Sequence, residues 1–405
     1  MADSRQAAFG AAAVSVATPI AERVRPHVTL IALLSLGHFA IDVMQGALPA
    51  LLPFVKQQHH LSYTATGTIV LAGTLSSSII QPLFGYLADQ TARRWMLPAS
   101  VLLAGTGLAL LGVAPSYPVL LALVLGMGIG AAAFHPEAYR TATSVAGPRK
   151  ATALSWFALG GNAGIAIGPP VITQLVTTLG LGGSLLMLIP SLIAAALFVT
   201  VLPRFTVASR PAETSAATAG VNRPGAMALL VVVVMLRSWT SLGFTTFVPF
   251  YYLDVLKADP HVVGMLLFAF LGAGALGTVA TGPLADRWGA RPFMVWVFAA
   301  VSPLAVLFLH VTGPLAFVVL ALMGIALVST FTVSVVLGQQ YMPRNPGMAS
   351  GLIVGVATGT AGLGVTVLGS IADTHGLLTA LWISALMPIA GFITAAFLPR
   401  PHPAA

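Results

Sequence analysis

The sequence predicts an all-α membrane protein with twelve transmembrane helices arranged as two six-helix bundles. Three observations lead to this fold class. First, 57% of the 405 residues are hydrophobic and 7% are charged, whereas soluble globular proteins carry about 25% charged residues. Second, the mean hydropathy is +0.95, and the apolar residues fall into long runs that a water-soluble fold could not cover. Third, the second half of the chain repeats features of the first.

Each predicted span has the length that a bilayer requires, which is about 20 mostly apolar residues for a helix. Short loops rich in Pro, Gly and polar residues separate the spans. The twelve spans are predicted at 28–53, 63–87, 96–114, 118–142, 151–178, 183–202, 226–252, 262–285, 293–311, 314–340, 349–372 and 378–398.

The spans divide the chain into five parts. Residues 1–27 are polar or alanine-rich and are predicted to form a disordered cytoplasmic N-terminus. Residues 28–202 are predicted to form the N-terminal six-helix bundle, and residues 226–398 the C-terminal one. Between them, residues 203–225 contain three prolines and no periodic pattern, which predicts a flexible cytoplasmic linker. Residues 399–405 form a cytoplasmic tail.

The distribution of Lys and Arg predicts the orientation, because cytoplasmic loops carry an excess of both. With the N-terminus in the cytoplasm, fourteen Lys and Arg residues fall in inside segments and two, Lys56 and Lys257, in outside loops. The other two, Arg140 and Arg237, fall within spans. The bias predicts that both termini are cytoplasmic, and it requires an even number of spans.

An internal repeat relates the two halves. The motif G-Y-L-A-D ends at Asp89, five residues before Arg94, and the motif G-P-L-A-D ends at Asp286, five residues before Arg291. Each follows the second span of its half. Two six-span halves related in this way are typical of transporters whose substrate site lies between the halves near the membrane midplane.

A row of glycines at intervals of four residues is also repeated. This spacing places the glycines on one helix face, where they permit close packing against another helix. The rows are Gly160, Gly164 and Gly168 in the fifth span and Gly351, Gly355 and Gly359 in the eleventh.

The loop motif G-x-L-A-D-x-x-x-x-R, present in both halves, resembles the signature loop of the major facilitator superfamily. The Gly-x-x-x-Gly-Pro run ending at Pro169 is similar to the Gly-Pro motif of its drug–proton antiporter branch. Several short blocks in order also resemble the fosmidomycin resistance protein family of bacterial inner-membrane exporters. These blocks are Ser35–His38 with Asp42, Phe134–Glu137 with Arg140, Gly160–Asn162, Gly362–Gly364 and Ile371–Asp373.

This resemblance implies the major facilitator fold, a location in the inner membrane, and export of a small drug in exchange for protons. One position departs from the pattern of the antiporter branch. An Arg usually stands four residues before a Gly-x-Gly-Ala-Ala run in its fourth span, and here Val124 occupies that place. Another residue must therefore carry the proton.

Ionisable side chains inside a span cost at least about 2.5–3.5 kcal/mol on insertion scales, and they usually have a function. His38 and Asp42 lie four residues apart in the first span, so they share a helix face. Burial disfavours the charged carboxylate, whereas a neighbouring His or Arg favours it. This balance predicts that the pair carries a proton; the alternative is a permanent pair that packs helices.

The fourth span contains Phe-His-Pro-Glu at 134–137, followed by Arg140. Pro136 removes a backbone donor, which predicts a kink. We expect Glu137 to carry a proton, and His135 or Arg140 to meet an anionic substrate. The alternative is a structural Glu137–Arg140 ion pair near the cytoplasmic end of the span, with Arg140 reaching toward the headgroups.

Arg237 lies near the midplane of the seventh span, and no acid of the second half lies at comparable depth. Its partner is therefore an acid of the first half or an anionic ligand, which Arg can bind through two N–H groups. A permanent salt bridge between the halves is the alternative. Gln45, Asn162 and Trp239 are weaker candidates for lining the substrate site.

The repeated loops predict a cytoplasmic gate. A carboxylate is favoured near a helix N-terminus, so we expect Asp89 to face the start of the eleventh span and Asp286 to face the start of the fifth. Arg94 and Arg291 would support the same contacts, which hold the cytoplasmic side closed. The resemblance to the superfamily implies this role as well.

Several classes of function are not expected. The absence of cysteine excludes disulfides, Cys-based zinc sites and iron–sulfur clusters. His59 and His60 lack a third ligand, so no metal site is predicted, and no cofactor is expected. The positive charges are scattered, which argues against nucleic-acid binding. The expected partners are a small-molecule substrate, protons and the lipid bilayer, and the chain is expected to act as a monomer.

The sequence thus predicts a secondary active transporter, not an enzyme, that exports a small anionic or polar drug such as a fosmidomycin-like phosphonate. One alternative is a proton symporter that imports a small organic anion, because the same site can open to both sides. The other is a non-transporting membrane sensor or an intramembrane enzyme, which would have no path across the bilayer.

Overall fold

The computed structural model describes residues 28–90, 93–146, 150–201, 203, 221–357 and 359–400. These residues form helices and connecting turns, with no β-strand among them. The predicted N-terminus at 1–27 and most of the predicted linker, 204–220, lie outside the described residues. The end of the predicted tail, 401–405, also lies outside them.

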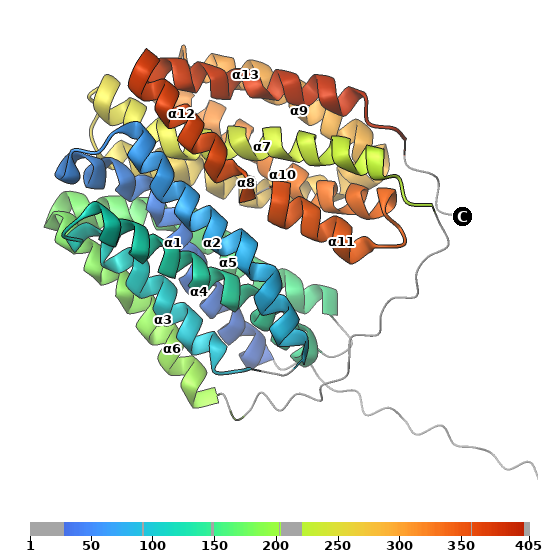
Figure 1. Ribbon diagram of the computed structural model, residues 1–405, viewed down its shortest axis with the longest axis horizontal. Coiled ribbons are helices and arrows are strands. Elements are labelled where there is room, and N and C mark those ends of the chain that lie inside the picture. Colours follow the sequence, from blue (N-terminus) through green and yellow to red (C-terminus); the bar gives the residue numbers. More distant parts are fainter. Residues whose placement is uncertain are drawn as a thin grey trace, which may run out of the picture.

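The first half contributes six spans, which Figure 1 shows in blue to green. They are α1 (Val28–His59), α2 (Tyr63–Gln90), α3 (Met96–Ala109) with the 3-10 turn η1 (Leu111–Val113), α4 (Tyr117–Val145), α5 (Lys150–Leu179), and the 3-10 turn η2 (Leu181–Met187) leading into α6 (Leu188–Val201).

The second half contributes six more, one of them broken. They are α7 (Pro224–Phe250) with the π-helical turn η4 (Tyr251–Val255), α8 (His261–Trp288), α9 (Ala290–Phe308), α10 (Pro314–Tyr341), the broken span made of α11 (Pro346–Gly351), the π-helical turn η5 (Leu352–Ala357) and α12 (Ala361–His375), and α13 (Leu377–Ala396).

Eleven helical segments among the described residues are long and apolar enough to cross a membrane. The twelfth span is α5, a 30-residue helix that carries the first glycine row and two adjacent prolines. It packs against α1 of its own half and α8 of the other half, so part of its surface faces helices instead of lipid and a lower hydropathy suffices. The prediction of an all-α membrane protein with twelve transmembrane helices in two six-helix bundles is confirmed.

The two halves touch through α2 with α12 and through α5 with α8. Glycines allow the backbones to approach at these crossings: a Cβ on Gly67 would lie 2.9 Å from Thr366 Cα, and a Cβ on Gly264 would lie 2.7 Å from Pro170 Cα. An apolar core that draws on both halves fills this region, including Val70 on α2. We call this end of the molecule the far end.

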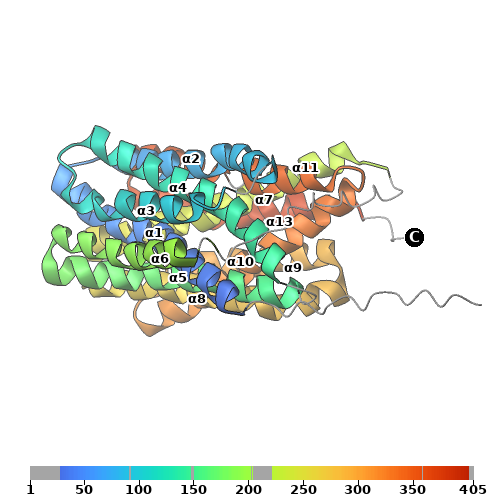
Figure 2. The same ribbon diagram turned by 90° about the horizontal axis from the view of Figure 1, so that it is seen from below.

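The opposite end carries the last residue of α6 and the first of α7, and we call it the linker end. Figures 1 and 2 show α11 at this end, and Figure 1 shows the two bundles diverging toward it. Cβ atoms on Gly85, Gly347 or Gly351 would meet nothing within 4 Å, and Leu83 and Tyr86 of α2 are exposed. The halves are therefore closed at the far end and separated at the linker end.

Polar contacts across the halves reinforce the far end. Asp373 of α12 accepts hydrogen bonds from the backbone N–H groups of Tyr63 and Thr64, both at 2.8 Å, and from the Thr64 hydroxyl at 2.6 Å. The Tyr63 hydroxyl donates to Asp254 at 2.7 Å, and Lys56 pairs with the same carboxylate at 3.4 Å. Asp373 thus satisfies the free N–H groups that begin α2, as an N-cap does, but from the other half.

Replacing Asp373 by Asn should weaken far-end closure, because an amide can no longer present two acceptor oxygens to these donors. Loss of a cap costs about 0.5–2 kcal/mol, so the ratio of closed to open protein should fall severalfold. The sequence contains no cysteine, so spin labels on introduced cysteines at the exposed positions Gln58 and Thr379 would report the change as longer distances. Unchanged distances would show that apolar packing alone closes this end.

Candidate functional site

The candidate site centres on Asp42, in the middle of α1. Helical spacing places His38 one turn away on the same face, and α4 brings His135 from the opposite side. The two Nε2 atoms lie 3.3 Å from different oxygens of the carboxylate, His38 from Oδ2 and His135 from Oδ1. Gln45 donates to Oδ1 at 2.8 Å. We call Asp42, His38 and His135 the imidazole–carboxylate cluster.

The second ring nitrogen of each imidazole determines what the first can do. His38 Nδ1 lies 2.9 Å from the carbonyl oxygen of Phe157, and His135 Nδ1 lies 2.7 Å from that of Ala131. A carbonyl oxygen only accepts, so both Nδ1 atoms carry hydrogen. A neutral imidazole then turns a lone pair toward Asp42. Each contact with the carboxylate therefore needs a proton on the imidazole or on the acid.

Helix α5 closes the cluster. The Phe157 ring stacks on His38 with centroids 4.3 Å apart. Gly161 leaves room for both groups, because a Cβ there would overlap His38 Nε2 and lie 2.6 Å from Asp42 Oδ2. The rings of Tyr139 on α4 and His38 form a T-shaped pair with centroids 6.3 Å apart. Asp42 is buried and His135 is partly exposed, so the cluster has an opening on the His135 side.

Glu137 forms a separate pair. It is fully buried, and its Oε1 lies 2.5 Å from Arg140 Nη2, with a second contact of 3.3 Å between Oε2 and Nε. The two are three residues apart on α4, as the sequence indicated for the ion-pair alternative. Helix α4 runs without a break past Pro136. The structure therefore brings His135, rather than Glu137, to Asp42.

Arg237 is buried near the middle of α7. Its Nη2 donates to the Ser238 hydroxyl at 3.0 Å, and its guanidinium lies 5.5 Å from the centre of the Phe331 ring on α10. Its Nε has no hydrogen-bond partner among the described residues. Neither Asp42 nor Glu137 pairs with it.

The weaker candidates fall in different places. Gln45 belongs to the site through its bond to Asp42. Asn162 is half-buried on α5. The Trp239 indole lies against α12, where a Cβ on Gly364 would lie 2.7 Å from its Cγ, and its Nε1 is buried with no partner among the described residues.

The predicted gate residues lie at the open linker end. The side chain of Asp89 lies outside the described residues, and Arg94 is half-buried. Asp286 is exposed and lines a cavity of about 220 Å³ between α8, α9 and α10. No ion pair joins it to α5 in the described part of the chain. Arg291 instead donates to the backbone oxygens of Leu398 and, at 2.7 Å, Ala396. It satisfies carbonyls at the end of α13, which lack helical partners.

The two glycine rows differ in their contacts. In the first row, Gly164 and Gly168 face backbone atoms of α1, and a Cβ on Gly164 would lie 2.5 Å from the oxygen of Phe39. In the second row, a Cβ on Gly351 would meet nothing within 4 Å, and one on Gly355 would lie 4.0 Å from the nearest atom. Only Gly359 is close, at 2.9 Å from Ser78 Cβ. The first row packs tightly, whereas most of the second does not.

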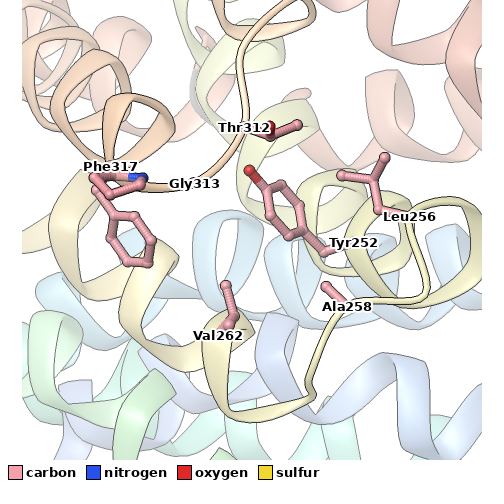
Figure 3. Close-up of a pocket in the computed structure, with 8 residues that line it drawn as sticks. Tyr252, Leu256, Ala258, Val262, Thr312, Gly313 and Phe317 are labelled. Carbon is pink, nitrogen blue, oxygen red and sulfur yellow. The ribbon is translucent and has the colours of Figure 1, made fainter.

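Two further features bear on ligands. The cluster is the one group of three His or acidic residues in the described part of the chain whose ligand atoms lie within 4.8 Å of one another. Its three members could hold a cation, but a proton shared across each 3.3 Å contact requires no fourth ligand. A separate apolar cavity of about 690 Å³ lies at the far end of the second half. Figure 3 shows the Tyr252 hydroxyl pointing toward Thr312 at its edge, and no member of the cluster lines it.

Comparison with known proteins agrees with this architecture. The profile described as Major Facilitator Superfamily matches residues 34–259 and 227–405. The chain is 31% identical over 398 residues to YfnC, an uncharacterised MFS-type transporter of Bacillus subtilis, covering 94% of this chain and 96% of the relative. It is 29% identical over 410 residues to the fosmidomycin resistance protein of Escherichia coli, covering 98% of each.

Solved structures share the fold at low sequence identity. A bacterial homologue of the human lysosomal transporter Spinster, in an inward-facing and occupied conformation, superposes with a TM-score of 0.77 at 14% identity, covering 93% of this chain and 97% of that one. A mutant of the nucleoside transporter NupG gives a TM-score of 0.78 at 16% identity, covering 92% and 100%. The chain therefore belongs to the Major Facilitator Superfamily, and it is a multi-pass membrane transporter rather than an enzyme.

Proposed function

We propose that the protein is a proton-coupled antiporter that exports a small anionic or polar drug of the fosmidomycin-like phosphonate class across the bacterial inner membrane. The observation that carries the proposal is the imidazole–carboxylate cluster, which needs protons to make its own contacts. The similarity to a fosmidomycin resistance protein over nearly the whole chain supports the drug class and the outward direction.

Alternating access is the expected cycle. The halves are closed at the far end and separated at the linker end, as one extreme of a rocking motion requires. The excess of Lys and Arg on the linker side supports a cytoplasmic location for this end. Since the path lies between the two halves of one chain, we expect the protein to act as a monomer.

Proton loading would change how the helices pack. With a proton in each contact, Asp42 holds α1 and α4 together through the two imidazoles. Without these protons, the carboxylate of Asp42 and the lone pairs of the two Nε2 atoms face one another next to Phe157 and Gly161 of α5. Three acceptors without a donor in so small a volume cost free energy. The only other titratable ring against the cluster, among the described contacts, is Tyr139. Because α5 also packs on α8, loss of the protons would change the packing between the two halves.

Transport into everted membrane vesicles tests the proposal. With fosmidomycin as the probe and an acidic interior, vesicles that contain the protein should accumulate the drug, and a protonophore should abolish the accumulation. Accumulation equal to that of vesicles without the protein would reject export of this class. Accumulation in right-side-out vesicles driven by an acidic exterior would instead support the import alternative.

A further inference from the structure

We infer that Arg237 binds the anionic group of the transported molecule, a tetrahedral oxyanion such as a phosphonate. The inference rests on the proposed function for the chemical class of substrate, and it adds the position in the molecule where the charge is held. The sequence indicated Arg237 as one of several candidates. The structure supplies the reason to select it.

The first step is the burial of an uncompensated cation. Arg237 is 6% exposed, in the middle of a membrane helix. A guanidinium has five N–H donors, and the described residues provide one acceptor, the neutral hydroxyl of Ser238. The Phe331 ring lies beside it at 5.5 Å. Neither group neutralises the charge, so the site as it stands is unfavourable.

The second step is the distribution of acids. In the second half, Asp254 and Asp373 lie at the far end in the contacts described above, and Asp259 binds the backbone N–H of His261. Asp286 lies at the linker end. No ion pair of Arg237 with any of them occurs in the described part of the chain.

The third step concerns the acids at the same depth in the first half. Both are already compensated there: Asp42 by two imidazoles and an amide, and Glu137 by Arg140. Arg237 is thus the one guanidinium at mid-depth without an acid among the described residues. The described residues supply no anion to this site, so the inference assigns that place to the transported molecule.

The fourth step concerns the kind of anion. A free Nε beside the Nη groups is the edge that binds two oxygens of a phosphonate or carboxylate at once. A lipid headgroup does not supply it, because a residue midway along a spanning helix lies roughly 20 Å from either end of that helix. A small diffusible anion that enters between the halves can supply the two oxygens.

Binding to the purified protein provides the first test. By isothermal titration at one pH, Arg237→Gln should weaken the affinity for fosmidomycin by about 10- to 100-fold, because charged hydrogen bonds are lost. The affinity of Arg237→Lys should lie between those of the wild type and Arg237→Gln. A neutral dialkyl ester of the same phosphonate should bind the wild type and Arg237→Gln about equally. Arg287→Gln, which removes an exposed arginine of α8, is the matched control and should not change either affinity.

Thermal stability without ligand provides the second test. An unpaired buried charge destabilises the protein, so Arg237→Met should raise the melting temperature by about 2 °C or more. A permanent salt bridge predicts a fall, because the mutation would leave a buried acid unpaired. A fall would overturn the inference.

The outcomes separate this inference from the proposed function. If the wild type exports fosmidomycin and Arg237→Gln binds and exports it equally well, the anion site is wrong and the function stands. If the wild type neither binds nor exports a phosphonate while Arg237→Met is stabilised, the function is wrong in its substrate class. Equal loss of affinity for the charged and neutral ligands would show that Arg237 is structural.

Discussion

Replacing Asp42 by asparagine should abolish proton-driven export, reducing drug accumulation in everted vesicles to the level of vesicles without the protein. An amide can donate to one neutral Nε2, whereas its oxygen can accept from the other only if that imidazole is protonated, and the amide itself neither gains nor loses a proton near neutral pH. The variant therefore resembles a cluster in which one of the two contacts is permanently satisfied. It should keep the packing of α1 against α4 and lose the ability to respond to the gradient.

Counterflow distinguishes this effect from general damage. Exchange of labelled for unlabelled drug at equal pH on both sides requires the substrate site and the rocking motion but no net proton movement, so Asp42→Asn should retain it. Asp259→Asn, in an exposed turn, is the matched control and should retain both activities. Full gradient-driven accumulation by Asp42→Asn would show that the cluster does not carry the proton.

Replacing Gly161 by alanine should have an effect of similar size for a steric reason. The added methyl group would overlap His38 Nε2 and crowd Asp42 Oδ2. His38 cannot yield cheaply, because Phe157 holds it through both its carbonyl oxygen and its ring. We expect folded protein in the membrane at normal amounts, with gradient-driven export near background, measured in the same vesicle assay.

Two other glycines provide the controls for this variant. A Cβ on Gly182 would meet nothing within 4 Å, so Gly182→Ala should behave as the wild type. A Cβ on Gly160 would overlap the backbone oxygen of Ser35, and a backbone atom cannot rotate away, so Gly160→Ala should lower the amount of folded protein. If Gly161→Ala exports normally, α1 and α5 are more loosely packed than the structure indicates.

The sequence was sufficient for features that depend on one helix at a time. Hydropathy predicted the twelve spans, and the interval of four residues placed His38 and Asp42 together. The sequence was insufficient for contacts between different helices. Spacing along α4 could not show that His135, not Glu137, reaches Asp42, because that depends on how α4 is rotated about its axis.

The far-end contacts show the same limit over a longer range. Asp373 and Thr64 are separated by 309 positions in the chain, and the block 371–373 that contains Asp373 does not indicate Thr64 as its partner. Arg291 was expected to support the gate because of its place in the repeated loop. In the structure Arg291 instead donates to backbone carbonyl oxygens at the end of α13, a contact that its place in the loop motif does not indicate.

The π-helical turn η5 breaks the symmetry between the halves. In the first half, α5 lies rigidly on α1, whereas at the corresponding place in the second half the glycine row is largely free and the helix is wound more widely. We therefore expect bending to concentrate at η5 while the first half moves as a unit. Turnover speed and drug selectivity would then reside in different helices, so mutation can alter how fast the protein pumps without altering what it pumps.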